Sequence, residues 1–449
     1  MEKEKRNYGL FTTITMIVGI CIGSGIFFKS DNILSATGGN VLLGVIVFVL
    51  GATSIIFGGL CISELAARTD CPGGIITYME EFVNEKFACG MGWFQIFVYY
   101  PTVIAVVSWV VGIYICILFG LEGKFETQML IGFIYFTFIF VLNSLSAKLG
   151  GGFQNFSTVS KMIPLILIAV LGLLFGNPVE GLKNTSASTL NGATWLAAIG
   201  PVAFSFDGWT ISTSIAAEIR DSKKNLPRAL IIAPIFVLLT YVAYFIGVSS
   251  LLEPQKIIEL QDAHVYVVAE RLFGSIGAQI ILIFVIIAVM GTVNGIILGY
   301  IRLPYSMAIR GNKMFPLSEK LSQHDDKRGV PVNSAIFCYI VTIIWYIIHY
   351  FTVKFNVLPN SDISEISIVM SYIFYLILYY KVFTLYRKGE IHSIYKGVIV
   401  PILATIGSMF ILSGGLQNKL FFIYAAICIM VVLISFLYYN SHSKSSKMQ

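Results

Sequence analysis

The stretch ITMIVGICIGSGIFF, residues 14–28, decides the fold that we expect. It lies inside an apolar segment, residues 9–37, that is long enough to cross a membrane, yet Gly23-Ser24-Gly25 interrupts it near its centre. A helix in lipid has to satisfy its own backbone, so an interruption is tolerated only where the freed groups face protein or a water-filled cavity. We therefore expect a broken helix in the interior of a helical membrane protein.

The composition of the whole chain supports a membrane protein. Of the 449 residues 57% are hydrophobic and 12% are charged, about half the charged fraction of soluble domains. This excludes a water-soluble enzyme, and the 34 Phe and 23 Tyr residues exclude a disordered chain. The sequence has neither a nucleotide-binding G-x-x-x-x-G-K-[ST] loop nor a metal-binding histidine pair, so we expect no enzyme activity, no metal and no cofactor.

Hydropathy predicts twelve membrane spans, separated by breaks that carry Gly, Pro, Asn and charge. The expected spans are 9–37, 41–66, 88–119, 128–146, 155–176, 193–219, 229–251, 275–308, 332–350, 362–386, 396–413 and 420–438. The predicted fold class is an all-α integral membrane protein with about 12 transmembrane helices. We treat residues 1–449 as a single polytopic membrane domain.

An even number of spans places both chain ends on the same side of the membrane. If this side is the cytoplasm, most of the 30 Lys and Arg residues lie in cytoplasmic segments, as the positive-inside rule requires. The opposite loops hold only Lys124, Lys183, Lys256, Arg271, Lys354 and Lys419. We therefore expect cytoplasmic termini, and since this rule accounts for the net charge of +6, we expect no nucleic-acid partner.

A second interrupted span lies in the other half of the chain. IGPVAFSFDGWTIS, residues 199–212, holds Phe206-Asp207-Gly208 in the sixth span. Breaks at corresponding positions of two halves point to a transporter's binding site. The start of a half-helix favours an anion and the end of another suits a cation, so a zwitterion such as an amino acid matches both. The alternative is that the glycines of the first break only permit close helix packing.

Asp207 and Lys161 are the ionisable residues with the strongest functional hypotheses, and each has a structural alternative. A carboxylate near the bilayer midplane is costly, and Asp207 either accepts a hydrogen bond from a substrate ammonium, carries a proton, or caps the following half-helix. Lys161 is either a fixed cation against the carbonyl end of the broken first span or a side chain that snorkels to the interface.

Three further features remain open on the sequence alone. Asn294 in the eighth span either bridges helices or contacts the substrate. The aromatic residues Phe204, Phe206 and Trp209 flank the second break, and they are either a gate over a ligand or part of the packing. The amphipathic segment 68–90 is expected to lie along the cytoplasmic surface.

Several short motifs occur in a characteristic order along nearly the whole chain. They are Gly23-Ser24-Gly25-Ile26-Phe27, Glu64-Leu65-Ala66-Ala67-Arg68 with Pro72-Gly73-Gly74 and Tyr78, Phe204-Ser205-Phe206-Asp207-Gly208-Trp209, Glu218 with Asn225-Leu226-Pro227-Arg228-Ala229, Gly291-Thr292-Val293-Asn294-Gly295, and Arg302 with Arg310-Gly311 and Pro316. In this order they resemble the amino acid–polyamine–organocation (APC) superfamily. Within it they are similar to the L-type amino acid transporter branch and its bacterial serine/threonine and alanine/serine/cysteine exchangers.

The resemblance implies a LeuT-like core of two inverted five-helix repeats, with helices 1 and 6 discontinuous. The first repeat then covers residues 9–176, the second covers 193–386, and two extra helices occupy 396–438. It also implies that the loop after the third span is informative, because animal relatives carry a cysteine there that bonds to a glycoprotein partner. The loop Gly120 to Thr127 has no cysteine, so we expect no covalent heavy-chain partner.

The resemblance also implies roles for individual residues. The backbone around the first break is expected to receive a substrate carboxylate, and the carbonyls of Phe204, Ser205 and Asp207 its ammonium, with Phe204 as an outer gate. Lys161 matches a lysine that stands in for sodium. The implied substrate-binding set is Cys21, Ile22, Gly23, Ser24, Gly25, Phe204, Ser205, Phe206, Asp207, Gly208, Trp209 and Asn294. Looser expectations for the side-chain pocket are Pro101, Ile104 and Ser371.

The function expected from these observations is the transport of small to mid-sized neutral amino acids, without sodium, by an exchanger in the plasma membrane of a bacterium. The expected partners are the amino acid substrate and the lipid bilayer. One alternative is a proton-coupled importer that uses Asp207 or Lys161. Another is a sensor that binds an amino acid on a transporter fold without moving it.

Overall fold

The computed structural model describes residues 9–23, 25–69, 74–121, 124–183, 194–210, 219–325, 329–358 and 360–445. Helices dominate these ranges, in agreement with the predicted fold class. Ten of them are long and apolar enough to cross a membrane. Ten of the predicted spans overlap these helices, so the prediction of a multi-pass helical membrane protein is confirmed at this level.

The ten long helical segments follow one another with short connections. They are α3 (Val41–Ala66), α5 with η1 and α6 (Glu85–Leu118), α7 (Phe125–Leu145), α8 (Ala147–Phe175), α11 (Ser222–Leu251), α13 (His264–Tyr300), α16 (Val332–Lys354), α17 (Ile363–Arg387), η6 with α18 (Tyr395–Gly415) and α19 (Phe421–Ser445). Shorter connecting helices are α4 (Ile75–Phe82), α9 (Pro178–Lys183), α12 (Pro254–Leu260), α14 (Arg302–Ala308) and α15 (Ser318–Leu321).

The two remaining predicted spans are not single helices. The first consists of α1 (Leu10–Cys21) and α2 (Gly25–Ala36), so the chain is unwound between them, and Ser24 in this break lies outside the described ranges. The sixth begins with η3 (Thr194–Ala198) and α10 (Ile199–Ser205) and then leaves the helix. Its expected second half falls on residues 211–218, which the structure does not describe.

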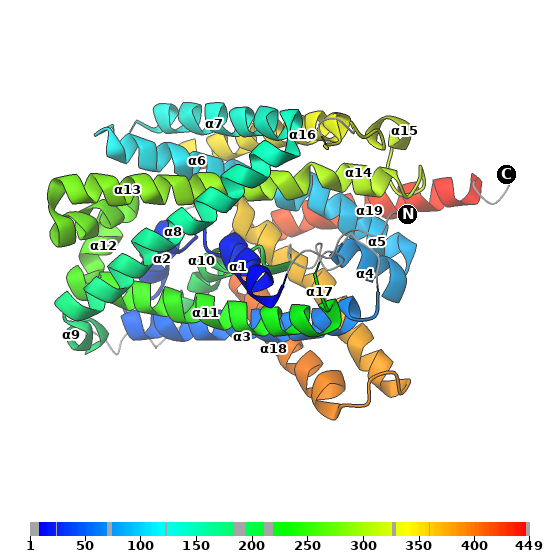
Figure 1. Cartoon of the computed structure of the whole chain (residues 1–449), viewed down its shortest axis with the longest axis horizontal. Helices are drawn as coiled ribbons and strands as arrows, with labels where there is room; N and C mark the ends of the chain where they lie inside the picture. Colours follow the sequence, from blue (N-terminus) through cyan, green and yellow to red (C-terminus); the bar gives the residue numbers. More distant parts are fainter. Residues whose placement is uncertain are drawn as a thin grey trace.

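The short helices lie inside the bundle. In Figure 1, α1 lies between α13 on one side and α11 and α3 on the other. Helix α1 packs against α11 and α8, and α2 packs against α10. Outward faces of the surrounding helices are apolar, for example Phe138 (58% exposed) on α7 and Ile406 (60%) on α18. These exposed apolar faces of the surrounding helices are suited to lipid, so the polar groups of the inner helices α1, α2 and α10 contact protein instead.

The two ends of the bundle are also distinct. Figure 1 shows α9 and α12 at one end and α4, α5 and α15 at the other. At the second end, Arg310 pairs with Glu80 of α4 and Lys313 pairs with Glu85 of α5, each at 2.7 Å. The segment 68–90 therefore lies at this end, held by ion pairs, although residues 70–73 of it are outside the described ranges.

Candidate functional site

The two interrupted helices touch at their breaks. A Cβ added to Gly25, the first residue of α2, would lie 2.5 Å from the Cα of Ser205, the last residue of α10. Such a contact is closer than side chains tolerate, so glycine is required for the backbones to approach this closely. The beginning of one half-helix and the end of another therefore meet at one place.

Side chains from neighbouring helices satisfy the carbonyls at the end of α1. The last four carbonyls of a helix lack intrahelical partners. The Lys161 Nζ on α8 donates to the Gly19 carbonyl, and the Tyr241 hydroxyl on α11 lies 2.9 Å from the Cys21 carbonyl. The same Tyr241 hydroxyl lies 2.9 Å from the carbonyl of Ser205 at the end of α10. Tyr241 thus ties the two breaks together.

Lys161 is fully buried, with an exposed fraction of 0%. Its bond to Gly19 directs the ammonium to the end of α1, where the helix dipole and the unpaired carbonyls favour a positive charge. A lysine that snorkels would extend its ammonium to the interface instead. The observed contact is therefore the geometry that a fixed cation requires.

Asp207 lies two residues beyond the end of α10 and faces the third span. Its Oδ2 accepts a hydrogen bond from the Tyr99 hydroxyl at 2.6 Å, and its N–H donates to the Phe204 carbonyl at 3.1 Å. Tyr99 ends η1 (Gln95–Tyr99), a π-helical turn that continues into α6 (Tyr100–Leu118). The carboxylate therefore has a tyrosine partner, while the half-helix it was expected to cap lies outside the described residues.

A small cavity lies at the meeting point of the breaks. It is lined by Gly19, Cys21, Gly23, Gly25, Tyr99, Tyr100, Val103, Val107, Gln154, Phe204, Asp207, Gly208, Thr292, Gly295 and Ile296. Its volume of about 40 Å³ admits only a few water molecules. An amino acid is larger, so the helices have to separate before such a ligand can enter.

The predicted site residues divide into those that line this central cavity and those that do not. The lining residues are Cys21, Gly23, Gly25, Phe204, Asp207 and Gly208. Ile22 and Ser205 are buried beside them, and Ser24 lies outside the described residues. Of the expected pocket residues Pro101, Ile104 and Ser371, none is among the lining residues.

The three aromatic residues of the second break have different neighbours. The Phe204 ring lines the cavity, and it lies 6.2 Å from the Phe28 ring. Phe206 instead packs on Tyr241 at 5.3 Å between ring centroids, and Trp209 packs on Tyr375 at 5.7 Å. Phe204 is therefore the member of this trio whose position suits a gate.

Asn294 lies in a hydrogen-bond network between helices. Its Nδ2 donates to the Gly150 carbonyl at 3.0 Å and to Gln154 Oε1 at 3.1 Å, and its Oδ1 accepts from Asn143 at 3.0 Å. These bonds join α13 to α8 and α7. They support the helix-bridging alternative, and contact of Asn294 with a substrate stays a prediction.

A second group of charges was not predicted from the sequence. Lys29 on α2 donates to Asp362 Oδ2 and to Glu365 Oε1, each at 2.6 Å, and all three side chains are at most 7% exposed. The Lys29 ammonium also lies 5.0 Å from the centre of the Phe204 ring. This ion cluster fastens α2 to the start of α17 next to the candidate gate.

Comparison with known proteins gives consistent matches over most of the chain. The pattern of the family described as "Amino acid permease" matches residues 8–443. The serine/threonine exchanger SteT of Bacillus subtilis is 32% identical over 92% of this chain and 91% of its own length. The mouse b(0,+)-type amino acid transporter 1 is 26% identical over 97% and 87%. The human Asc-type amino acid transporter 1 is 27% identical over 74% and 64%.

Proposed function

The chain belongs to the amino acid permease family of the APC superfamily, and we propose that it exchanges small to mid-sized neutral amino acids across the plasma membrane by alternating access. The family and these relatives are transporters, so the prediction that the chain is a membrane transporter of amino acids and not an enzyme is confirmed. Beyond this, we propose the substrate range, the exchange mechanism and the roles of the site residues.

The meeting of the two breaks is the observation that carries this proposal. The start of α2 offers N–H groups without intrahelical acceptors, and the contact of Gly25 with Ser205 brings the carbonyl end of α10 to the same point. A zwitterion can place its carboxylate on the N–H groups and its ammonium on the carbonyls of Phe204, Ser205 and Asp207. This arrangement recognises the part that all amino acids share.

Lys161 supplies the charge that a coupling ion would otherwise supply. Its ammonium is already bonded to the end of α1, so this end needs no sodium ion for neutralisation. We therefore include sodium independence in the proposal. Either Asp207 or Lys161 would carry the proton in the alternative proton-coupled importer.

The membrane arrangement is also part of the proposal. Twelve spans arise if residues 9–37 and 193–219 each cross as a broken helix beside the ten long ones. The two inverted repeats would then be 9–176 and 193–386, with 396–438 as extra helices, and both termini would be cytoplasmic by the positive-inside rule. On this topology the Lys29 cluster and Phe204 lie on the outer side of the central cavity.

Exchange in proteoliposomes tests the proposed function. Vesicles loaded with one neutral amino acid, for example serine or threonine, are expected to accumulate the radiolabelled form from outside, while empty vesicles are not. Accumulation that instead needs an inward pH gradient and no internal amino acid would replace the exchanger with the proton-coupled importer. Binding without any transport would indicate the sensor.

A further inference from the structure

A second and larger cavity shares no lining residue with the central one. It has a volume of about 390 Å³, opens to the surface, and is lined by residues of α2, the η3–α10 segment, the start of α17, the end of α18 and the segments that connect them. Helices α2 and α10 contribute to both cavities. The second cavity therefore shares two half-helices with the proposed transport site.

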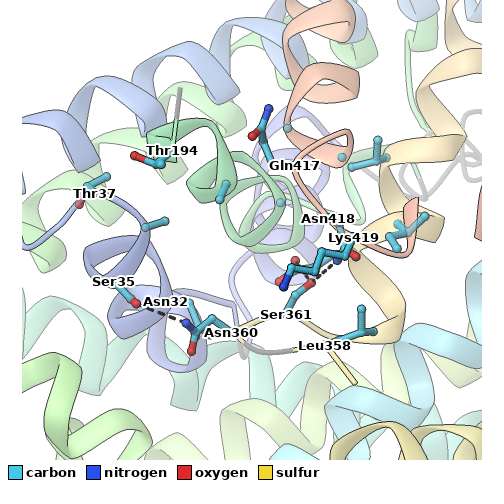
Figure 2. A pocket seen from close by; sticks show the side chains of 18 of the residues that line it. Asn32, Ser35, Thr37, Thr194, Leu358, Asn360, Ser361, Gln417, Asn418 and Lys419 are labelled. Carbon is cyan, nitrogen blue, oxygen red and sulfur yellow. Dashed lines mark hydrogen bonds between the residues drawn. The ribbon is translucent and has the colours of Figure 1, made fainter. Parts of the chain in front are cut away.

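The rim and the floor of this cavity differ in character. Figure 2 shows polar side chains around it, and Asn360, Gln417 and Lys419 among them are exposed. Glu365 on the floor is only 5% exposed. Ser361 connects the two levels, because its hydroxyl donates to Glu365 Oε2 at 2.7 Å and accepts from Asn418 at 3.0 Å.

The floor carries more negative than positive charge. Lys29 is one cation between two carboxylates, Asp362 and Glu365. A carboxylate accepts about four hydrogen bonds, and Glu365 accepts two from the described residues, so it has room for another donor. Burial of an uncompensated charge is costly, which favours a cationic group from a ligand.

The rim carries the opposite charge. Lys419 is exposed and has no hydrogen bond or ion pair with any residue in the described part of the chain. A ligand that reaches from floor to rim therefore meets an anion at one end and a cation at the other. An amino acid carries both of the charges that complement these two ends, whereas a plain amine or a plain carboxylate carries only one of them.

We propose that this cavity is a second binding site for an amino acid, with the ammonium at Glu365 and the carboxylate at Lys419. The site is additional to the proposed transport function, which requires only the central cavity. Because Glu365 also bonds Lys29, a ligand in the second cavity acts on the contact that fastens α2 to α17. Its occupancy is thereby linked to the movement of α2.

Cysteine protection on the full chain in lipid nanodiscs tests this proposal. The reporter is Gln417→Cys, in a background with Cys71→Ser, because the six cysteines in the described ranges are buried. A pool of the nineteen L-amino acids other than cysteine, whose thiol would consume the reagent, is expected to slow modification by a membrane-impermeant methanethiosulfonate several-fold. The matched control, Lys124→Cys, has its reporter at an exposed lysine outside the cavity and is expected to react at an unchanged rate.

Two further variants and two single-charge compounds decide the result. Lys419→Ala is expected to abolish the protection, and n-butylamine or butyrate is expected to give none. Val103→Phe, which fills the central cavity, is expected to leave the protection intact. The proposal is overturned if the pool does not protect, if protection survives Lys419→Ala, if either single-charge compound protects equally, or if Val103→Phe removes protection. Protection without any exchange in proteoliposomes would refute only the transport function.

Discussion

Replacement of Tyr241 with phenylalanine removes one hydroxyl and leaves the ring in place. That hydroxyl lies 2.9 Å from the carbonyls of Cys21 and Ser205, and the tyrosine is 0% exposed, so water cannot take its place without a structural change. Leaving a buried acceptor unpaired costs about 1–3 kcal/mol. The population of the conformation that holds both breaks together is therefore expected to fall by about 5- to 150-fold, at 1.4 kcal/mol per factor of ten.

Tyr244 provides a matched control on the same helix. It is also 0% exposed, but its hydroxyl has no hydrogen-bond partner among the described residues. Tyr244→Phe is therefore expected to leave stability and exchange nearly unchanged. The assay is the initial rate of amino acid exchange in proteoliposomes together with the thermal unfolding midpoint of purified protein. Equal behaviour of Tyr241→Phe and Tyr244→Phe in both measurements would refute the role of Tyr241 as the tie between the breaks.

Three further changes test other parts of the site. Lys161→Ala is expected to reduce exchange at least tenfold, because the carbonyl end of α1 loses its buried cation. Wild-type exchange is expected to be equal in sodium and potassium buffers. Full activity of Lys161→Ala would argue against the coupling role of this lysine. Val103→Phe is expected to block amino acid binding in a radioligand assay by filling the central cavity, at a stability cost of about 1–3 kcal/mol. The control is Val159→Phe on the lipid-facing surface, where the valine is 71% exposed, and this variant is expected to bind the amino acid normally in the same assay. Asp362→Asn replaces one carboxylate partner of Lys29 with a neutral amide and is expected to lower the unfolding midpoint. It is also expected to weaken the contact of α2 with α17, seen as faster labelling of the Gln417→Cys reporter from outside. An unchanged midpoint and labelling rate would contradict the role of the Lys29 cluster in holding these helices together.

Glycine positions illustrate what local sequence can reveal. The Gly23-Ser24-Gly25 break was predicted because three small residues interrupt an apolar run, and the chain does leave the helix between Cys21 and Gly25. From the sequence alone, Gly25→Val would serve as a test of whether a ligand approaches this turn. The structure shows that a Cβ there would meet the Ser205 backbone with no ligand present, so this variant would disturb helix packing itself. Val103→Phe is therefore the better probe.

The residues that were missed act over long sequence separations. Tyr241 is one aromatic among many in an apolar span, and only the packing of α11 against α1 and α10 gives its hydroxyl two carbonyls. Tyr99 is the last residue of a π-helical turn, a feature often found at functional sites, but this turn is visible only in the structure. Lys29 gives no local signal for its ion pairs, because its carboxylate partners lie more than 330 residues away.

The central claim is that the two unwound turns bind the two ends of one amino acid. The most direct measurement is an experimental map of the full chain with its transported amino acid bound. We expect the ligand carboxylate within hydrogen-bond distance of the N–H groups at Gly25 and Ile26, and its ammonium at the carbonyls that end α10. A ligand bound in the reversed orientation, or away from both turns, would contradict the claim.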